Sequence, residues 1–427
     1  MGKKLNFLVL AVLVASTLFF GEGFAAEAAT DALDTGDTAW MLVASAFVLL
    51  MTPGLAFFYG GMVNKKNVIS TMLQSFVALG VVSIVWVAVG FSLAFGDSLG
   101  GIIGNPATYF NFRGVGVAPN PDFAATIPFL LFALFQLKFA IITPALITGS
   151  FAERVRFRSY ILFMVLFTLV IYAPLAHMTW HPGGLFRNWG VLDYAGGTVV
   201  HMSAGFAALA GAIFLGKRKQ TTHEPSNVPF IILGTGLLWF GWFGFNSGSA
   251  LGANGDAVVA FANTNLASAS AMITWMFYER FQDRKMSALG ACIGAIVGLV
   301  AITPAAGFVT IGQSIFIGFA AALTSNLAIR LKNKSELDDT LDVFPSHGVG
   351  GIVGMILTAV FAREVGLIYG ETTTFLYHLL ALAIVAVFTF GGSWLLYKLV
   401  DLLLPLRVTS DQELRGLDAS QHGERVD

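Results

Sequence analysis

Two histidines, His201 and His347, lie inside long apolar stretches of the sequence. His201 belongs to the charge-free run between Asp193 and Lys217, and His347 stands at the head of the apolar run that ends at Ala362. Imidazole donates and accepts hydrogen bonds and titrates near neutrality. An ionisable group at membrane depth is costly unless a cavity or a partner compensates, so it marks a functional site by default. Two such groups predict a shared polar path across a bilayer.

The composition is that of a polytopic membrane protein with an all-α fold. Of the 427 residues, 56% are hydrophobic and 11% are charged, against roughly 25% charged residues in a soluble domain. The 47 glycines fit this class, because small residues let membrane helices approach closely. The single cysteine, Cys292, excludes an internal disulfide and a cysteine-based metal cluster. The net charge of −1 says nothing about partners, and no nucleic acid is expected among them.

Residues 1–26 have the pattern of a cleaved signal peptide. Lys3 and Lys4 precede the apolar run 5–20, and small residues follow around Ala25. A retained first helix is the alternative. Cleavage implies a bacterial export route, so the mature N-terminus is expected in the periplasm and the protein in the inner membrane.

Charge-free intervals mark the candidate membrane spans, because a bilayer crossing needs roughly 20 apolar residues. The intervals are 38–64, 67–96, 123–152 (interrupted only by Lys138), 159–186, 194–216, 225–255, 257–278, 286–329, 343–362 and 372–397. The interval 286–329 is long enough for two helices and breaks near Pro304 and Gly307. We therefore expect eleven spans in a transmembrane domain over 38–403, followed by a cytoplasmic tail over 404–427.

The distribution of basic residues supports this topology. With the N-terminus outside, the connections expected in the cytoplasm carry Lys65, Lys66, Arg154, Arg156, Arg158, Lys217, Arg218, Lys219, Arg280, Arg284, Lys285, Arg330, Lys332 and Lys334. The connections on the other side carry only Arg113, Arg187 and Arg363. Cytoplasmic loops are the ones enriched in Lys and Arg, so the C-terminus is expected in the cytoplasm.

An odd number of spans predicts two five-helix halves and one extra helix, the inverted-repeat plan of many transporters. The sequence Ile-Thr-Pro-Ala at 142–145 in the third span recurs at 302–305 in the eighth. The two histidines fall in the fifth and tenth spans, which are equivalent under this repeat. A pseudo-two-fold axis in the membrane plane would bring His201 and His347 together near the midplane.

The other polar and aromatic residues of the spans suggest the solute. The spans hold no acidic cluster for a metal or sodium and no arginine cluster for an anion, but they hold Phe135, Phe139, Trp180, Trp242, Phe243, Phe245, Ser247 and Ser249. A ring face attracts a cation by about 0.5 to 2 kcal/mol, which is too little to dehydrate an alkali cation. A small cation that donates hydrogen bonds and can lose a proton fits better. Without a nucleophile, a metal cluster or paired carboxylates beside the histidines, no enzyme, metal or cofactor is expected.

Several long segments carry a resemblance to a known family. They are Asp193 to His201 with Gly216-Lys217-Arg218, Gly241 to Asn246 with Gly248-Ser249, Asp342-Val343-Phe344 leading to His347 to Gly351, Pro53-Gly54, Phe58 to Gly61 with Asn67, Ala152-Glu153-Arg154 with Phe157, and Gly416-Leu417-Asp418 with His422-Gly423. From about residue 38 to the C-terminus the chain resembles the ammonium transporter (Amt/Mep/Rh) family, in its bacterial Amt branch.

The resemblance implies roles for individual residues. Ammonium recruitment at the periplasmic mouth would fall to Trp180, Phe139 and Ser249; the gate to Phe139 and Phe245; the pore lining to His201, His347, Trp242 and Phe135. Asp193 would shape the recruitment site and favour proton transfer, although an aspartate at a helix start can also simply cap the helix. Lys138 departs from the family pattern: beside the gate it would repel ammonium if it faced the vestibule, but it can also snorkel outward or pair at a subunit interface.

The resemblance also implies partners and leaves alternatives open. A homotrimer is expected, with the tail forming a docking surface for a PII-type regulatory protein, and with ammonium, ammonia and methylammonium as candidate solutes. The leading function is ammonium uptake. An Rh-like channel for ammonia or carbon dioxide and an ammonium sensor acting through a separate partner are the alternatives. Whether net ammonium crosses, or ammonia with a separate proton, stays open.

Overall fold

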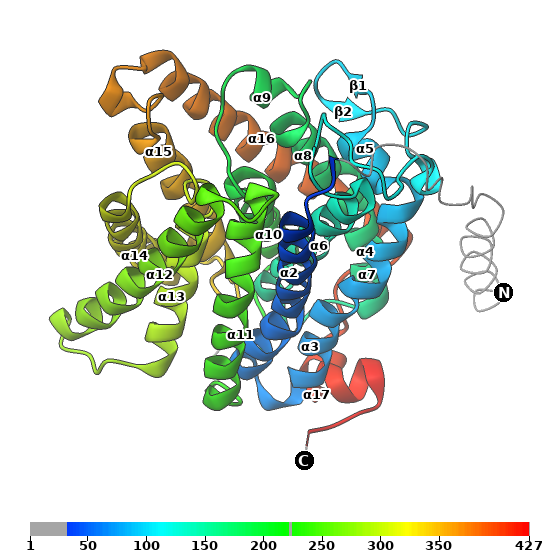
Figure 1. The fold of residues 1–427 in the computed structure, drawn as a ribbon. Helices are drawn as coiled ribbons and strands as arrows, with labels where there is room; N and C mark the ends of the chain where they lie inside the picture. The colour runs from blue at the N-terminus through cyan, green and yellow to red at the C-terminus, as the bar shows by residue number, and fades with distance from the viewer. Residues whose placement is uncertain (1–31, 222–223, 427) are drawn as a thin grey trace.

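A computed structural model describes residues 32–221 and 224–426. The expected signal peptide, residues 1–26, lies outside these ranges. The principal α-helices are α2 (Thr35–Met62), α3 (Val68–Phe76), α4 (Ala78–Val85), α5 (Phe91–Phe95), α6 (Phe129–Ile147), α7 (Phe157–Phe167), α8 (Ala173–Trp180), α9 (Leu185–Asn188), α10 (Ser203–Leu215), α11 (Val228–Ser247), α12 (Gly255–Phe281), α13 (Ala288–Ile302), α14 (Ile311–Asn333), α15 (Gly350–Phe361), α16 (Thr372–Leu403) and α17 (Ser410–Arg415). The helices stand side by side in one bundle (Figure 1).

Short helical pieces of other pitch extend several of these helices. Five-residue π-helical pieces join α4 to α5 and α7 to α8, and two six-residue π-helical pieces, Gly197–Met202 and Phe344–Val349, run directly into α10 and α15. The described chain also holds one small antiparallel hairpin, in which β1 (Ser98–Leu99) pairs with β2 (Ile103–Gly104). The fold is therefore all-helical apart from this hairpin in an outer loop.

Ten helical segments of the described chain are long and apolar enough to cross a membrane. They are Thr35–Met62, Lys65–Phe95, Phe129–Ser150, Phe157–Asn188, Gly197–Leu215, Val228–Ala250, Gly255–Phe281, Ile311–Asn333, Phe344–Phe361 and Thr372–Leu403. The interval 286–329 divides as expected, but its first helix, α13, has only 15 residues, fewer than the roughly 20 that span a bilayer. The expected count of eleven spans is not confirmed and stays a prediction.

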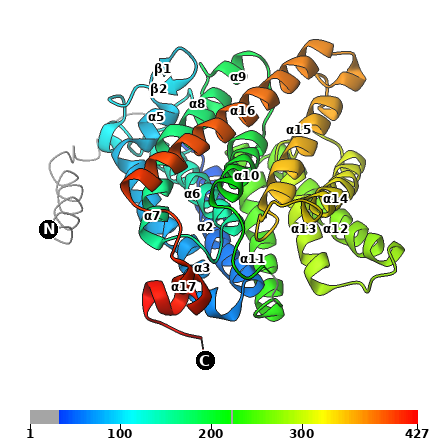
Figure 2. The ribbon, with the colours of Figure 1, turned by 180° about the vertical axis from the view of Figure 1, so that it is seen from behind.

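Close backbone contacts bring the central helices together. A Cβ on Gly205 of α10 would lie 2.3 Å from the Cα of Gly348, so only glycine fits there. The long helix α16 packs across α10 on the opposite side of the bundle from α11 (Figure 2). Glycine contacts of this kind are the usual means by which membrane helices pack without bulky side chains between them.

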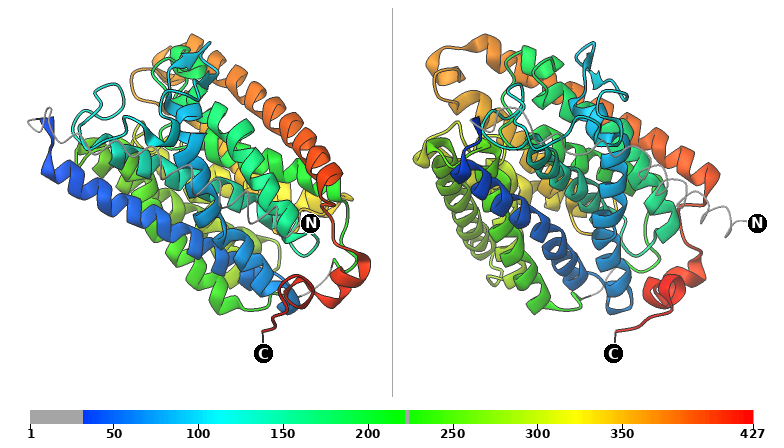
Figure 3. Two further views of the ribbon diagram at one scale, coloured as in Figure 1. Left: turned by 90° about the vertical axis from the view of Figure 1, so that its right-hand side faces the viewer. Right: turned by 45° about the vertical axis from the view of Figure 1, so that its right-hand side comes forward.

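The C-terminal tail packs against the start of α3 (Figure 3). The carboxylate of Asp418 accepts the backbone N–H groups of Ile69 and Ser70 at 3.1 and 2.7 Å. The side chain of Asn67 accepts the N–H of Leu417 at 2.7 Å. These bonds cap the first turn of α3 with tail residues, so the tail has a defined position.

Candidate functional site

His201 and His347 meet in the interior. Their Nδ1 atoms are 3.3 Å apart, and the two rings lie with centroids 5.4 Å apart at an interplanar angle of 29°. Both side chains are buried. Span counting had placed the two histidines in equivalent helices, and the structure brings them into hydrogen-bonding contact.

Each histidine lies in a π-helical piece at the start of its helix, and the two pieces touch. His201 belongs to Gly197–Met202 and His347 to Phe344–Val349. The contact between Gly205 and Gly348 lies one helical turn beyond His201 and one residue beyond His347. The main chains of the two segments therefore set the distance between the imidazole rings.

Asp193 caps the segment that carries His201. Its Oδ1 accepts the N–H groups of Gly196 and Gly197 at 2.8 and 2.6 Å, and its Oδ2 accepts the N–H and the hydroxyl of Thr198 at 2.7 and 2.5 Å. Its backbone carbonyl accepts the indole N–H of Trp180 at 3.1 Å. Asp193 therefore connects the segment that carries His201 to Trp180 by hydrogen bonds to main chain and ring, and both carboxylate oxygens are engaged.

Asp339 caps the segment that carries His347 in the same way, and the sequence did not reveal this role. Its carboxylate accepts the N–H groups of Val343 and Phe344 at 3.1 and 2.8 Å. Asp339 precedes His347 by the same number of residues as Asp193 precedes His201, and that spacing was the available signal. Burial and the negative charge of Asp342 raise the pKa of Asp339 to about 6, against the opposing effect of Lys332 and the two backbone N–H groups.

A buried ion-pair cluster holds the segment before Asp339. Arg218 Nη1 lies 2.8 Å from a carboxylate oxygen of Glu153, and Arg218 Nε lies 2.9 Å from Asp338 Oδ2. Arg154 donates to the backbone carbonyl of Asp338 at 2.6 Å. Burial disfavours the ionised carboxyl of Asp338, but the hydrogen bonds and positive charges of Arg218 and Arg154 hold its pKa below the ordinary value. These charged groups neutralise one another and fix the inner loops in place.

The hydroxyl of Thr303 determines which nitrogen of His201 carries the proton. Thr303 donates its only hydroxyl hydrogen to the carbonyl of Leu299 at 2.8 Å and accepts the indole N–H of Trp242 at 2.9 Å. Nε2 of His201 lies 3.2 Å from the same oxygen. Because the hydroxyl hydrogen is already used, His201 must be the donor in this contact, and its Nδ1 is then an acceptor. It follows that Nδ1 of His347 donates the hydrogen bond between the two rings.

This assignment leaves Nε2 of His347 with a free lone pair, because a neutral imidazole carries one proton. His347 also lines a small internal cavity together with Tyr59, Val343 and Ser346. The pair is therefore polarised: an N–H of His201 points to Thr303, and an acceptor nitrogen of His347 stands at the other end. Thr303 appeared in the sequence only as part of the repeated Ile-Thr-Pro-Ala, and its contact with His201 required the fold.

Aromatic rings in edge-to-face, tilted and stacked contact, here called the stack, lead from Trp180 to the histidines. The ring centroids of Phe139 and Phe245 are 4.2 Å apart, and those of Phe139 and Trp180 are 5.8 Å apart. Phe245 and Trp242 in turn stack on His201, at 6.0 and 5.4 Å. The stack therefore joins the outer cavity to the histidine pair.

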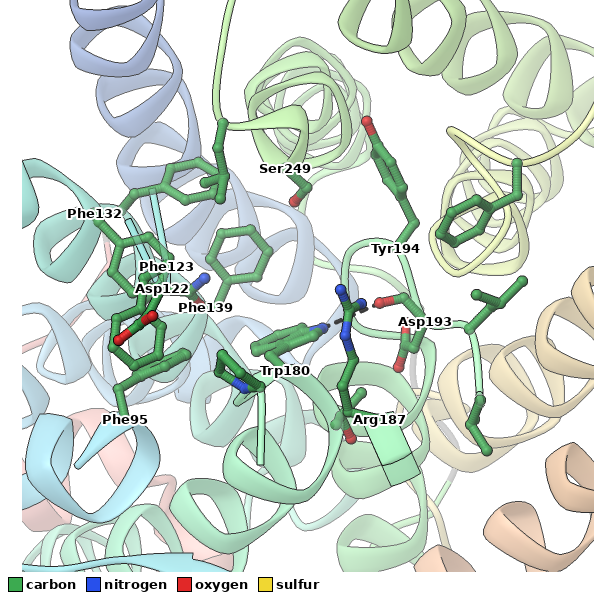
Figure 4. Close-up of a pocket in the computed structure, with 18 residues that line it drawn as sticks. Phe95, Asp122, Phe123, Phe132, Phe139, Trp180, Arg187, Asp193, Tyr194 and Ser249 are labelled. Atoms are coloured by element: carbon green, nitrogen blue, oxygen red, sulfur yellow. Dashed lines mark hydrogen bonds between the residues drawn. The ribbon is translucent and has the colours of Figure 1, made fainter. Parts of the chain in front are cut away.

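An outer cavity of about 480 Å³ opens above this stack (Figure 4). Its lining includes the predicted residues Phe135, Phe139, Trp180, Asp193 and Ser249. The hydroxyl of Ser249 donates to the carbonyl of Phe245 at 2.8 Å, so its lone pairs are available to accept a hydrogen bond from a solute.

Further residues that line this cavity include Asp122, Arg187 and Tyr194, to which the sequence analysis gave no role in the site (Figure 4). Asp122 and Arg187 are exposed and carry opposite charges. Lys138, by contrast, is not among the residues that line the cavity; it is partly buried on α6. The cation next to Phe139 in the sequence thus lies outside the lining of the outer cavity, whereas Arg187 lies in it.

Comparison with known proteins agrees with this arrangement. The profile of the Ammonium Transporter Family matches residues 39–426. The ammonium transporter of Aquifex aeolicus (strain VF5) is 46% identical over 418 residues, covering 96% of this chain and 97% of that protein. The crystal structure of Saccharomyces cerevisiae Mep2 is similar with a TM-score of 0.84 at 35% identity over 89% of each chain, and a structure of a sensor Amt protein with a TM-score of 0.85 at 30% identity over 91% of this chain and 98% of that one. This protein belongs to the ammonium transporter family.

Proposed function

We propose that this protein takes up ammonium from the periplasm across a bacterial inner membrane. The cation is recruited at the outer cavity, loses one proton there, and passes the histidine pair as ammonia. The observation that carries this proposal is the continuous path from the outer cavity through the Phe139–Phe245 stack to a polarised pair of buried imidazoles.

Recruitment depends on replacing the water around the cation. The ring faces of Phe139 and Trp180 offer cation–π attraction, and the free lone pairs of Ser249 accept an ammonium N–H. Asp193 acts indirectly, because its carboxylate oxygens already bind three backbone N–H groups and one hydroxyl. Through its hydrogen bonds it fixes the position of Trp180 relative to the start of the segment that carries His201.

Deprotonation follows from the cost of burying a charge. Below the gate the path is lined by aromatic rings and imidazoles, and an unpaired charge in such surroundings is strongly disfavoured. Ammonium therefore separates into ammonia and a proton before it enters. Ammonia can donate an N–H to Nε2 of His347 as it passes. The proton either returns to the periplasm or crosses separately, and the sign and size of the current distinguish these two cases.

The test is the ammonium-evoked current of proteoliposomes containing the wild type, His201→Ala or His347→Ala. We expect each substitution to lower the current by about tenfold or more, since a change of about 1.4 kcal/mol in the barrier already has that effect. His177→Asn is the matched control: His177 is buried but bonds to the carbonyl of Ala94 and the hydroxyl of Ser98, away from the path. An unchanged current in His201→Ala would contradict the role of the pair.

We also propose eleven spans arranged as two inverted five-helix halves and one extra helix. Three observations support it: the recurrent spacing from aspartate to histidine, the two π-helical pieces that carry the histidines, and the repeated Ile-Thr-Pro-Ala. The family resemblance is the basis for a homotrimer and for a PII-type protein on the cytoplasmic side. The ordered tail offers such a protein a fixed surface.

An ammonium sensor acting through a separate partner is the second candidate, favoured by the likeness to a sensor Amt protein. An ammonium pulse that changes the intrinsic fluorescence of the protein while evoking no current would support the sensor. An Rh-like channel would instead carry ammonia or carbon dioxide without charge movement. A current that saturates with ammonium and with methylammonium would favour the transporter over both.

A further inference from the structure

We propose that His378 is a positioning residue for the outer cavity, acting through the backbone of Leu192. This inference rests on the proposed recruitment of ammonium at that cavity. His378 lies in the second turn of α16, far along the chain from both pore histidines. Its side chain is fully buried, although the neighbouring Leu376, Leu379 and Leu380 are exposed.

The imidazole of His378 bonds to the loop that precedes Asp193. The N–H of Leu192 donates to Nε2 of His378 at 2.9 Å. Residues 191–193 belong to no helix or strand, so this N–H has no partner in regular secondary structure. An N–H can be accepted only by an unprotonated ring nitrogen, so the proton of the neutral ring is on Nδ1. Nδ1 is buried and makes no hydrogen bond among the described residues, so Leu192 is the hydrogen-bond partner of this ring.

The bonded residue adjoins the point where the site is assembled. Leu192 precedes Asp193, whose carbonyl accepts the indole N–H of Trp180 and whose carboxylate caps the segment carrying His201. Leu192 and Asp193 both line the outer cavity. A shift of the Leu192 backbone would therefore move the ring of Trp180 relative to Phe139.

A second contact attaches the same helix to the same loop. Tyr377 stacks on Trp189 with ring centroids 5.4 Å apart and an interplanar angle of 25°. Two consecutive residues of α16 thus hold the loop at positions 189 and 192. Of the two, only the imidazole supplies a directional hydrogen bond. The flanking N–H groups of Val191 and Tyr194 donate to the carbonyls of Phe186 and Pro304, so His378 supplies the side-chain bond that positions the backbone at Leu192 between them.

The experiment measures KM and maximal rate for radiolabelled methylammonium in proteoliposomes. We expect His378→Leu to raise KM about three- to tenfold, the size of effect of one lost hydrogen bond at a binding site, with a maximal rate close to that of the wild type. His378→Gln should restore KM, because its amide oxygen can accept the N–H of Leu192 in place of Nε2. Thr389→Val on the same helix is the control; Thr389 is buried and bonds to neither segment.

A merely structural role predicts a different pattern, in which both substitutions reduce the amount of folded protein or the maximal rate and leave KM unchanged. That result would overturn the inference. If His378→Leu does not fold, His378→Asn carries the same test, since its amide is one methylene shorter than glutamine and does not reach Leu192; a wild-type KM in His378→Asn would equally overturn the inference. Failure of the wild type to transport methylammonium or ammonium would instead count against the proposed function itself.

Discussion

Replacing Thr303 with valine tests whether one hydroxyl sets the polarity of the histidine pair. Valine has nearly the same shape but no oxygen. The substitution leaves the indole N–H of Trp242 and the Nε2–H of His201 without the acceptor that now lies 2.9 and 3.2 Å away. It also removes the hydroxyl that donates to the carbonyl of Leu299.

The expected cost follows from the number of donors that are left unpaired. An unsatisfied buried donor costs about 1–3 kcal/mol, so two donors cost about 2–6 kcal/mol. The contact with His201 is long, which places the total in the lower half of that range. His201 can avoid part of this cost by moving its proton to Nδ1, but it then presents an N–H to Nδ1 of His347. The pair would reverse, and Nε2 of His347 would become a donor.

We therefore expect Thr303→Val to lower both the thermal midpoint in detergent and the ammonium current, the current by about tenfold or more. The control is Thr143→Val, the threonine at the matching position of the repeated Ile-Thr-Pro-Ala. Its hydroxyl donates only to the carbonyl of Phe139 at 2.7 Å, so no side-chain N–H loses its partner. Equal currents and equal midpoints in the two variants would refute the argument from Thr303.

Three further predictions concern the caps and the vestibule. Asp193→Asn replaces one carboxylate oxygen with an amide NH2 group that faces N–H or O–H donors. We expect a loss of about 1–3 kcal/mol in stability and a higher KM for ammonium. An unchanged KM would contradict the link between Asp193 and Trp180. The pKa of Asp339 is raised to about 6 from 3.8, so the folded state binds the proton more tightly, and the stability from this group is lost as pH rises through about 6. In Asp339→Asn, the thermal midpoint should change less with pH between roughly 4 and 7 than in the wild type. An equal slope of midpoint against pH in both proteins would exclude Asp339 as the source of the pH dependence. Arg187→Glu should lower KM for ammonium about two- to threefold at low ionic strength and less at high salt, because exposed charges are screened; a salt-independent KM difference would point to a structural effect instead.

The sequence predicts the part of the site that depends on periodicity and chain order. Counting apolar intervals led to the expectation that His201 and His347 pair, and the two rings are in contact. The eleven spans and two inverted halves behind that expectation stay a prediction. The break in 286–329 is visible in the sequence, although the shortness of α13 is not, since proline and glycine mark a break without fixing where the helix ends.

The remaining features depend on contacts between distant segments. Asp342 stands closer to His347 in the sequence, yet Asp339 is the cap, because Asp342 adopts a left-handed backbone conformation with φ of 57° and pairs with Lys332 at 2.5 Å. Likewise, nothing in the apolar sequence of α16 indicates that His378 accepts an N–H from the loop before Asp193. Composition and periodicity identify which residues are unusual, but the partner of each is decided by how the helices pack.

The contact between Gly205 and Gly348 has a consequence for how the path can move. Side chains change rotamer within nanoseconds, whereas packed helix backbones separate only in slower collective motions. Since main chain meets main chain beside the two imidazoles, the separation of the two helix backbones cannot change through side-chain rotamers at this contact. Under the proposed function, the path beside the two imidazoles would then keep a constant width. We expect it to discriminate between solutes by size without the rocking of two halves that many transporters require, so that transport would respond more to changes in the vestibule than to restraints on helix motion.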